Sequence, residues 1–367
     1  MGISAARVGG ISLKDGNFSR ELSHLTFEAT KMGDAVEKNN LFISIEHNEE
    51  NLNAELASII PYPIEEDKMD DPHYKAFLLL QAHMFSLPLP ICDYKTDLKS
   101  VLDQSIQKNI KKFFYQRKKK KREERGGHAM IDISVDEAHL RYVLHLILLL
   151  QCLIQATNPS RSTLHAIAPL IHSHIEELHQ NGIVCLPQLL EEEEAKQRLR
   201  SLSGIDAELY KEISSYFTIF PLLTVSLTLF MKSEASHGNF VAISPDSSTS
   251  TTSQEKIYAS YTIPPNSALQ MRFQLIYKNS PKTYAAAPHF PKLKRVGWYI
   301  VLGDLDESVD ELVALRRISF NHRKVNEAIN FDGPDECNAT FCLTALICSD
   351  SYVGLDQQFD IQIRTTH

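Results

Sequence analysis

Residues 268–277 read Ala-Leu-Gln-Met-Arg-Phe-Gln-Leu-Ile-Tyr, and an apolar side chain occupies every second position from Leu269 to Tyr277. This period of two is typical of a β-strand with one buried face. Turn-forming clusters such as 244–254 and Asn279-Ser-Pro separate further strand-like runs. These runs lie at 224–230, 297–302, 312–318, 339–347 and 359–364. Antiparallel strands with such punctuation predict a β-sandwich of the immunoglobulin or fibronectin type III kind.

Before about residue 215 the apolar positions follow a helical period instead. The helix predicted from Pro72 onward carries Ala76, Leu79, Leu80 and His83 at i, i+3, i+4 and i+7 spacing. Further helical patterns occupy 51–60, 138–155, 164–178 and 184–202. The last two flank Gly182 as a helix-turn-helix arrangement. Another pattern has an apolar stripe at 98–106 that continues through Ile110 and Phe113, with Thr96 or Asp97 as its cap. The fold class is therefore α+β and multidomain, with an all-α helical bundle and a helix-loop-helix module before an immunoglobulin-like β-sandwich.

With 367 residues the chain is long enough for two or three domains with sizeable cores. We expect a flexible leader at 1–19, a helical bundle at 20–162 with a basic insertion at 107–128, a helix-loop-helix module at 163–215, and the immunoglobulin-like β-sandwich at 216–367. The single tryptophan, Trp298, begins a strand-like run. We expect it to anchor the sandwich core rather than to stack on a ligand.

The charge is unevenly distributed. Hydrophobic residues make up 43% of the chain and charged residues 23%, and the formal net charge is −8. Residues 108–125 alone hold ten Lys or Arg against two Glu, which is +8, so the remainder sums to −16. This balance excludes a protein that coats nucleic acid generally, and polyanion binding must be local. The run Arg117–Arg122 is open to three interpretations: a nuclear localisation signal or nucleic-acid arm, a solvated surface insertion, or a segment absent from the mature protein, such as a translated intron.

Several features bear on the compartment. Six cysteines form no CxxC pair and lie in apolar surroundings, which predicts buried free thiols in a reducing compartment. The first ten residues lack the apolar core of a secretory signal. The longest apolar stretch, 143–154, is shorter than the roughly 20 residues of a bilayer span. We expect a nuclear or cytoplasmic chain that is neither secreted nor membrane-spanning.

No catalytic constellation stands out. Val135–His139 spells Val-Asp-Glu-Ala-His, like the Mg-ATP motif of helicase motors, but the sequence contains no GxxxxGK[ST] phosphate loop. We therefore interpret it as a coincidental loop. His165, His172, His174 and His179 cluster, yet His172 and His174 stand two apart, a spacing that points them away from each other on a helix. We predict no catalytic residue, no metal and no cofactor.

Five stretches carry a more specific signal: IEHNEENLNAELA at 45–57, DPHYKAFLLLQAH at 71–83, LPICDYKTDLKSVLDQ at 89–104, GWYIVLGD at 297–304 and SDSYVGLDQQFD at 349–360. Together they resemble the SEC-sixty-three-type unit that follows the motor domains in large superfamily-two helicases of the Ski-two-like group. The resemblance covers roughly residues 20–367. It implies a helical bundle, a small helix-loop-helix module and an immunoglobulin-like sandwich, as the periodicity also predicts.

The resemblance also implies a function, that of a non-catalytic accessory unit of an RNA or DNA helicase. In such helicases the bundle docks on the motor domains, and one of its helices acts as a ratchet along the single strand. The matching segment is 97–107, and Gln107 stands where the family usually carries an arginine. The expected partners are helicase motor domains in cis or in trans, single-stranded RNA or DNA, and helicase-complex proteins bound through the β-sandwich, without a membrane. The residues expected to face nucleic acid are Lys99, Gln104, Gln107, Lys111, Arg117, Lys118, Lys119, Lys120, Lys121 and Arg122.

Two other functions stay open. The chain could be a protein–protein interaction platform without nucleic-acid contact. It could also be a subunit of the endoplasmic-reticulum protein-translocation machinery, but that subunit is expected to have membrane spans and a His-Pro-Asp J-domain, and neither occurs in this sequence. The helicase motor domains are likewise outside these 367 residues, so we expect either a fragment or a stand-alone gene product.

Overall fold

A computed structural model describes residues 7–8, 49–62, 72–103, 140–233, 238–248, 251–252, 255–279, 282–304 and 311–366. Helices occupy the first part of the chain and strands the second, so the predicted α+β class is confirmed. The helical elements are α2 (Glu49–Ile59), α3 (Pro72–Phe85), an unlabelled helix at 93–103, α6 (Leu140–Gln155), the 3₁₀ turn η2 (Thr163–Ala166), α7 (His172–Gln180), α8 (Leu186–Glu191), α9 (Glu193–Arg200) and α10 (Ala207–Phe217).

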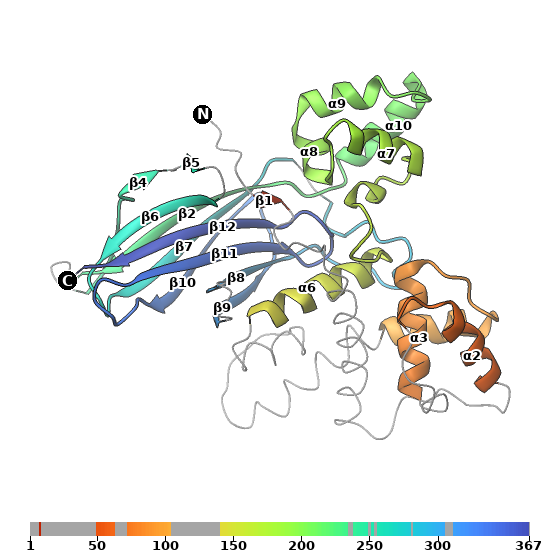
Figure 1. Ribbon diagram of the computed structural model, residues 1–367, viewed down its shortest axis with the longest axis horizontal. Helices are drawn as coiled ribbons and strands as arrows, with labels where there is room; N and C mark the ends of the chain where they lie inside the picture. Colours follow the sequence, from red (N-terminus) through yellow and green to blue (C-terminus); the bar gives the residue numbers. More distant parts are fainter. Residues whose placement is uncertain are drawn as a thin grey trace.

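The strands form two sheets that pack as a sandwich (Figure 1). The larger has the order β4-β6-β12-β11-β8-β9, with β1 paired to β12 and β5 to β6, and the smaller has the order β10-β7-β2-β3. Among the strands that the structure describes, β12 pairs with β6 in parallel and the other pairings are antiparallel. The strands are β1 (Arg7–Val8), β2 (Leu223–Lys232), β3 (Phe240–Ala242), β4 (Ser247–Ser248), β5 (Thr251–Thr252), β6 (Glu255–Ile263), β7 (Ala268–Tyr277), β8 (Trp298–Asp304), β9 (Glu311–Ile318), β10 (Lys324–Asp332), β11 (Thr340–Ser349) and β12 (Gln357–Thr365).

Some predicted boundaries are wrong, for local reasons. A single helix over 164–178 does not form, because Pro169 follows the turn η2 and disfavours helical backbone before it, so α7 begins only at His172. Helix α10 was not predicted, although the Asp206 side chain caps it by accepting a hydrogen bond from the Leu209 N–H at 2.8 Å. Strands β6 and β10 were also missed, and the predicted turn at 244–254 contains the short strands β4 and β5.

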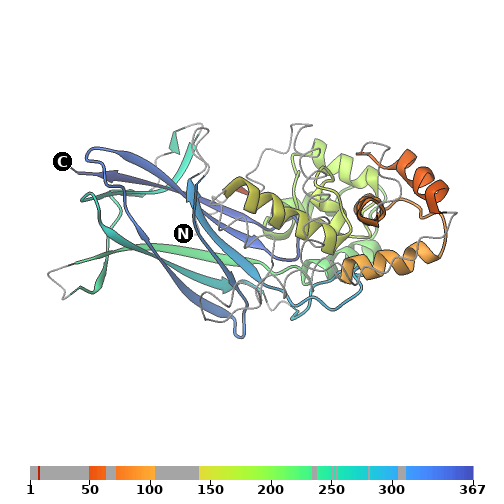
Figure 2. The same ribbon diagram turned by 90° about the horizontal axis from the view of Figure 1, so that it is seen from below.

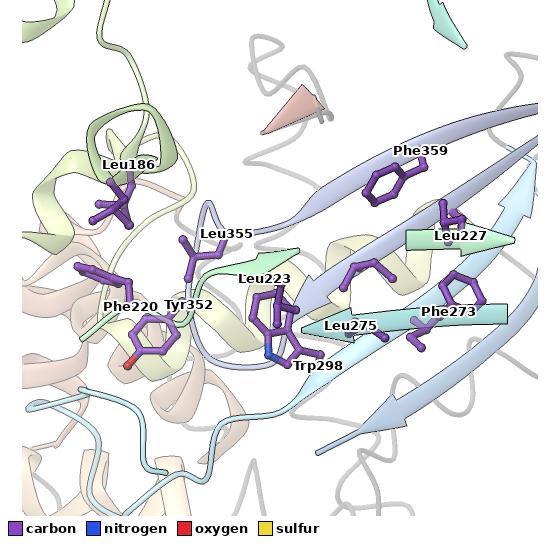
Figure 3. Close-up of a cluster of buried hydrophobic side chains, with 14 of the residues drawn as sticks. Leu186, Phe220, Leu223, Leu227, Phe273, Leu275, Trp298, Tyr352, Leu355 and Phe359 are labelled. Carbon is purple, nitrogen blue, oxygen red and sulfur yellow. The ribbon is translucent and has the colours of Figure 1, made fainter. Parts of the chain in front are cut away.

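Strand β8 is buried on both faces along its whole length. Trp298, Ile300 and Leu302 belong to the core between the two sheets, which continues into helices α7 to α10 (Figure 3). Tyr299 and Val301 point the other way, into a second core shared with α2, α3 and α6. A strand covered on both faces reads as a continuous apolar run, which explains Trp-Tyr-Ile-Val-Leu. Figure 2 shows α6 lying across the sheet that contains β8.

The predicted burial of all six cysteines is only partly right. Cys152 and Cys348 are buried and Cys185 is half-buried, but Cys92, Cys337 and Cys342 are exposed. Cys342 lies on β11 before the point at which that strand becomes buried on both faces. In the described residues no helix is long and apolar enough to cross a membrane.

Helix α6 is joined to the sandwich by two glutamines. The Gln151 side-chain amide donates to the Ser349 carbonyl at 2.7 Å and to the Asp356 carboxylate at 3.0 Å. The Gln155 amide donates to the Ser351 carbonyl at 2.7 Å. The Asp356 carboxylate also accepts from the Ser349 N–H at 2.8 Å. The stretch 349–356 is therefore the polar joint between the helices and the sheets.

Asp356 should make the stability of this joint depend on pH. Burial raises the pKa of its carboxyl to about 7, and the hydrogen bonds from Gln151 and Ser349 offset this only in part. The folded chain then holds a proton that the unfolded chain releases near pH 4, so this contribution to stability is present at low pH and is lost as the pH rises through about 7. As the pH rises from 4.5 to 7.5, the free energy of unfolding of Asp356→Asn should increase by about 1–3 kcal/mol relative to that of the parent. Urea unfolding at each pH measures this difference. Asp335→Asn, at an exposed turn, is the control; parallel pH profiles for the parent and Asp356→Asn would contradict the prediction.

Candidate nucleic-acid interface

Helix 93–103 contains the described part of the segment that the sequence matched to a ratchet helix. Its inner face is formed by Tyr94, Leu98, Val101 and Leu102, which pack into the core that α3 and α6 share. The Tyr94 hydroxyl donates to the Asn53 side-chain oxygen on α2 at 2.8 Å. The spacing of these side chains is that of one helical face, so the opposite face is left to solvent.

A buried ion pair fixes this helix to α3. The Lys75 ammonium lies 2.7 Å from the Asp97 carboxylate, and the Lys75 side chain is only 2% exposed. The same ammonium lies 4.4 Å from the centroid of the Tyr94 ring, a cation–π contact. Thr96 and Asp97 are therefore not caps as predicted, because the helix has already begun at residue 93 and Asp97 pairs across to α3.

The outer face carries two exposed lysines, Lys95 and Lys99, which we call the lysine pair. They are four residues apart, so they lie above one another on one face of the helix. Asp103 continues this line by one more turn, and its carboxylate lies 3.0 Å from the Lys292 ammonium of the segment before β8. Lys95 was not among the predicted nucleic-acid-facing residues, although its i, i+4 spacing from Lys99 places both side chains on one face.

The structure thus places one predicted nucleic-acid-facing residue, Lys99, on an exposed face. The other predicted residues lie outside the described residues, as do the basic insertion and the Val135–His139 motif. Those residues are Gln104, Gln107, Lys111, Arg117, Lys118, Lys119, Lys120, Lys121 and Arg122.

The predicted histidine cluster is brought together around η2 and α7. The rings of His165 and His172 lie 6.3 Å apart, and His179 Nε2 lies 3.0 Å from the Ser162 hydroxyl. Burial and the nearby Arg161 lower the pKa of His165. Within the described ranges no group of three or more His, Cys, Asp or Glu side chains has the geometry to hold a metal ion.

Known proteins are similar to this sequence over most of its length. The family model described as the Sec63 Brl domain matches residues 40–116 and 124–362. The chain is 29% identical to rat activating signal cointegrator 1 complex subunit 3, over 91% of this chain, and 31% identical to the DExH-box ATP-dependent RNA helicase DExH14 of Arabidopsis thaliana, over 87%. It is 22% identical to the human U5 small nuclear ribonucleoprotein 200 kDa helicase, over 88%.

These relatives are much longer proteins. The matched region is 15% of the rat protein and 12% of the Arabidopsis and human helicases. The resemblance seen in the sequence motifs is thereby confirmed, since the matched residues include helix 93–103, the strand GWYIVLGD and the joint at 349–356. Because the family model matches most of the residues of this chain, the chain belongs to the Sec63 Brl domain family.

Proposed function

We propose that this chain is a non-catalytic accessory unit of an ATP-dependent RNA or DNA helicase. In this role helix 93–103 contacts single-stranded nucleic acid with its lysine pair, while the helices and the sandwich dock motor or partner proteins. The observation that carries the proposal is the exposed lysine pair on a helix whose opposite face is held by the Lys75–Asp97 ion pair.

The helix is well suited to guide a flexible strand because its own position is restrained. Three separate elements hold it: Asn53 on α2, Lys75 on α3 and Lys292 before β8. The exposed ammonium groups can pair with phosphates, and such contacts position a strand without reading its bases. Relatives whose names include "ATP-dependent RNA helicase" and "small nuclear ribonucleoprotein … helicase" support the helicase context. The lack of a GxxxxGK[ST] phosphate loop in the sequence supports a non-catalytic role.

Replacing the lysine pair should make single-strand binding less sensitive to salt. Each phosphate neutralised on a single strand contributes about 0.7 to the slope of log affinity against log salt. Lys95→Gln with Lys99→Gln should therefore reduce the slope by about 1.4. Fluorescence anisotropy of labelled oligonucleotides across a salt series measures this slope. Replacing Lys118–Lys121 by alanine tests the basic run in the same way, since four contacts would account for a slope of roughly −3.

The matched control is Lys211→Gln with Lys232→Gln, which removes two exposed lysines from α10 and β2 instead. This control should keep the slope of the parent chain. An unchanged slope in the Lys95/Lys99 variant would exclude the lysine pair from the contact. If no single strand binds even at low salt, the nucleic-acid role fails and the interaction platform is favoured.

A further inference from the structure

Residues 282–296, Lys-Thr-Tyr-Ala-Ala-Ala-Pro-His-Phe-Pro-Lys-Leu-Lys-Arg-Val, form a second basic segment. It holds four Lys or Arg and no Asp or Glu, in a chain that is strongly acidic outside the insertion. Its two ends run antiparallel, with the Ala285 N–H donating to the Lys294 carbonyl at 2.8 Å and the Val296 N–H to the Thr283 carbonyl at 3.1 Å. We call this segment the basic hairpin.

The pairing sorts its side chains onto two faces. Tyr284 lies directly opposite Arg295, and residues paired in this way project to the same face. Neighbours along a strand alternate: Lys294 points inward, where its ammonium lies 2.6 Å from the buried Asp350 carboxylate, and Val296 is buried. The outer face therefore carries Tyr284, Leu293 and Arg295. The Tyr284 side chain is 49% exposed, the Leu293 side chain is 79% exposed, and Arg295 is exposed as well.

The outer cations are held by neutral groups rather than by acids. The Arg295 guanidinium donates to the Asn321 side-chain oxygen at 3.0 Å. The neighbouring Arg323 donates to the carbonyls of Tyr277 and Lys278 at 2.9 and 3.2 Å. Among the described residues no carboxylate lies within 4 Å of either guanidinium or of the exposed Lys282 ammonium. Their positive charge is therefore available to an external anion.

The basic hairpin also adjoins the helix of the proposed strand contact. Lys292 pairs with Asp103, the residue that continues the line of the lysine pair by one turn. Figures 1 and 2 both show the segment before β8 leaving the sandwich toward α3 and helix 93–103. A single strand of nucleic acid that passes the last turn of helix 93–103 thus meets the basic hairpin next.

We propose that the basic hairpin is a second contact for the same single strand, in which Lys282 and Arg295 bind phosphates and the Tyr284 ring stacks on a base. This inference rests on the proposed function of helix 93–103 and extends the path of the nucleic acid onto the sandwich. Exposed aromatic rings beside cations are the groups that hold single-stranded nucleic acid without sequence preference. An acidic peptide would need the cations but not the ring, which is why the exposed Tyr284 favours nucleic acid.

Two kinds of variant separate the two contacts. Lys282→Gln with Arg295→Gln should lower the salt slope by about 1.4, and its control, Lys211→Gln with Arg364→Gln, should leave the slope unchanged. Tyr284→Ala should weaken binding about 5- to 150-fold at one salt concentration with the slope retained, whereas Tyr284→Phe should bind like the parent. The probes are labelled oligouridylate and oligothymidylate of about 5 and about 15 nucleotides, and only the longer ones should respond to the hairpin variants.

Thermal unfolding of each variant by circular dichroism checks that the fold is kept. If the lysine-pair variant loses slope but the hairpin variants bind the long oligonucleotides like the parent, this inference is wrong while the proposed function stands. If the Tyr284→Phe variant binds as weakly as Tyr284→Ala, the stacking role is wrong. If the parent binds no oligonucleotide but does bind an acidic peptide through the hairpin cations, both proposals fail.

Discussion

Trp298→Ala should lower the free energy of unfolding by roughly 3–5 kcal/mol, the range found when a large buried aromatic side chain is removed. Trp298 is fully buried between the two sheets, where it faces Leu223 of β2 and Leu275 of β7 (Figure 3). Its indole N–H donates to the Tyr277 hydroxyl at 3.2 Å. Burial raises the pKa of Tyr277 to about 12, so this hydroxyl stays neutral over the physiological range. The truncation would leave both a cavity and a buried hydroxyl without its donor.

Urea unfolding followed by far-ultraviolet circular dichroism measures the loss, because Trp298 is the only tryptophan and the variant has no indole fluorescence. Trp298→Phe should lose less stability than Trp298→Ala, because most of the ring volume is kept. It still loses the hydrogen bond to Tyr277. Leu293→Ala, at a side chain that is 79% exposed, should change the stability by less than about 0.5 kcal/mol. A loss no larger for Trp298→Ala than for Leu293→Ala would refute the role of Trp298 as the anchor of the sandwich.

Asp350→Asn should cost about 3–5 kcal/mol in the free energy of unfolding, because it breaks a buried charge cluster by removing the carboxylate that two cations contact. The Asp350 carboxylate is fully buried, and both the Lys294 ammonium and the Arg317 guanidinium contact it. It also accepts from the Gly297 N–H at 2.8 Å and from the Ser351 hydroxyl at 2.6 Å. Burial opposes ionisation, but the two cations outweigh it and lower the pKa of Asp350 to about 2. Its contribution to stability is therefore present above about pH 4 and is lost as the pH falls toward 2.

A second substitution tests whether the cost comes from the uncompensated cations. Lys294→Met in the Asp350→Asn background should recover part of the lost stability, because one buried charge without a partner is then removed. Asp335→Asn serves as the exposed control. If the double variant is less stable than Asp350→Asn alone, the charge argument fails and the loss belongs to the hydrogen bonds of the Asp350 side chain.

Much of the fold was predictable because its periods are strong. The alternation of Ala268–Tyr277 predicted β7 with its observed bounds, and the apolar run at 138–155 predicted α6. Prediction failed where a pattern is weak or is interrupted. Strand β10 has the sequence Lys-Val-Asn-Glu-Ala-Ile-Asn-Phe-Asp, which places polar side chains on both faces of the strand. Its nine paired positions along β7 define it, rather than its own composition.

The candidate site was predictable in part for the same reason. A helical period predicts which residues share a face, so Lys99 could be expected to lie opposite Val101. The roles of Asp97 and Asp103 were not predictable, since their partners Lys75 and Lys292 are remote in the sequence. The same holds for Lys294 and Arg295, two adjacent cations of which one pairs with the buried Asp350 and the other is exposed.

The sequence by itself determined the fold class, most of the long elements and the family of this chain, because these depend on local periods and on long matching motifs. Only the tertiary structure decided which faces are covered. Alternation places Trp298 and Tyr299 on opposite sides of β8, but the burial of both sides requires the second sheet on one and helix α6 with the bundle on the other. Those elements are separated from β8 in the chain, and no local pattern specifies how they pack.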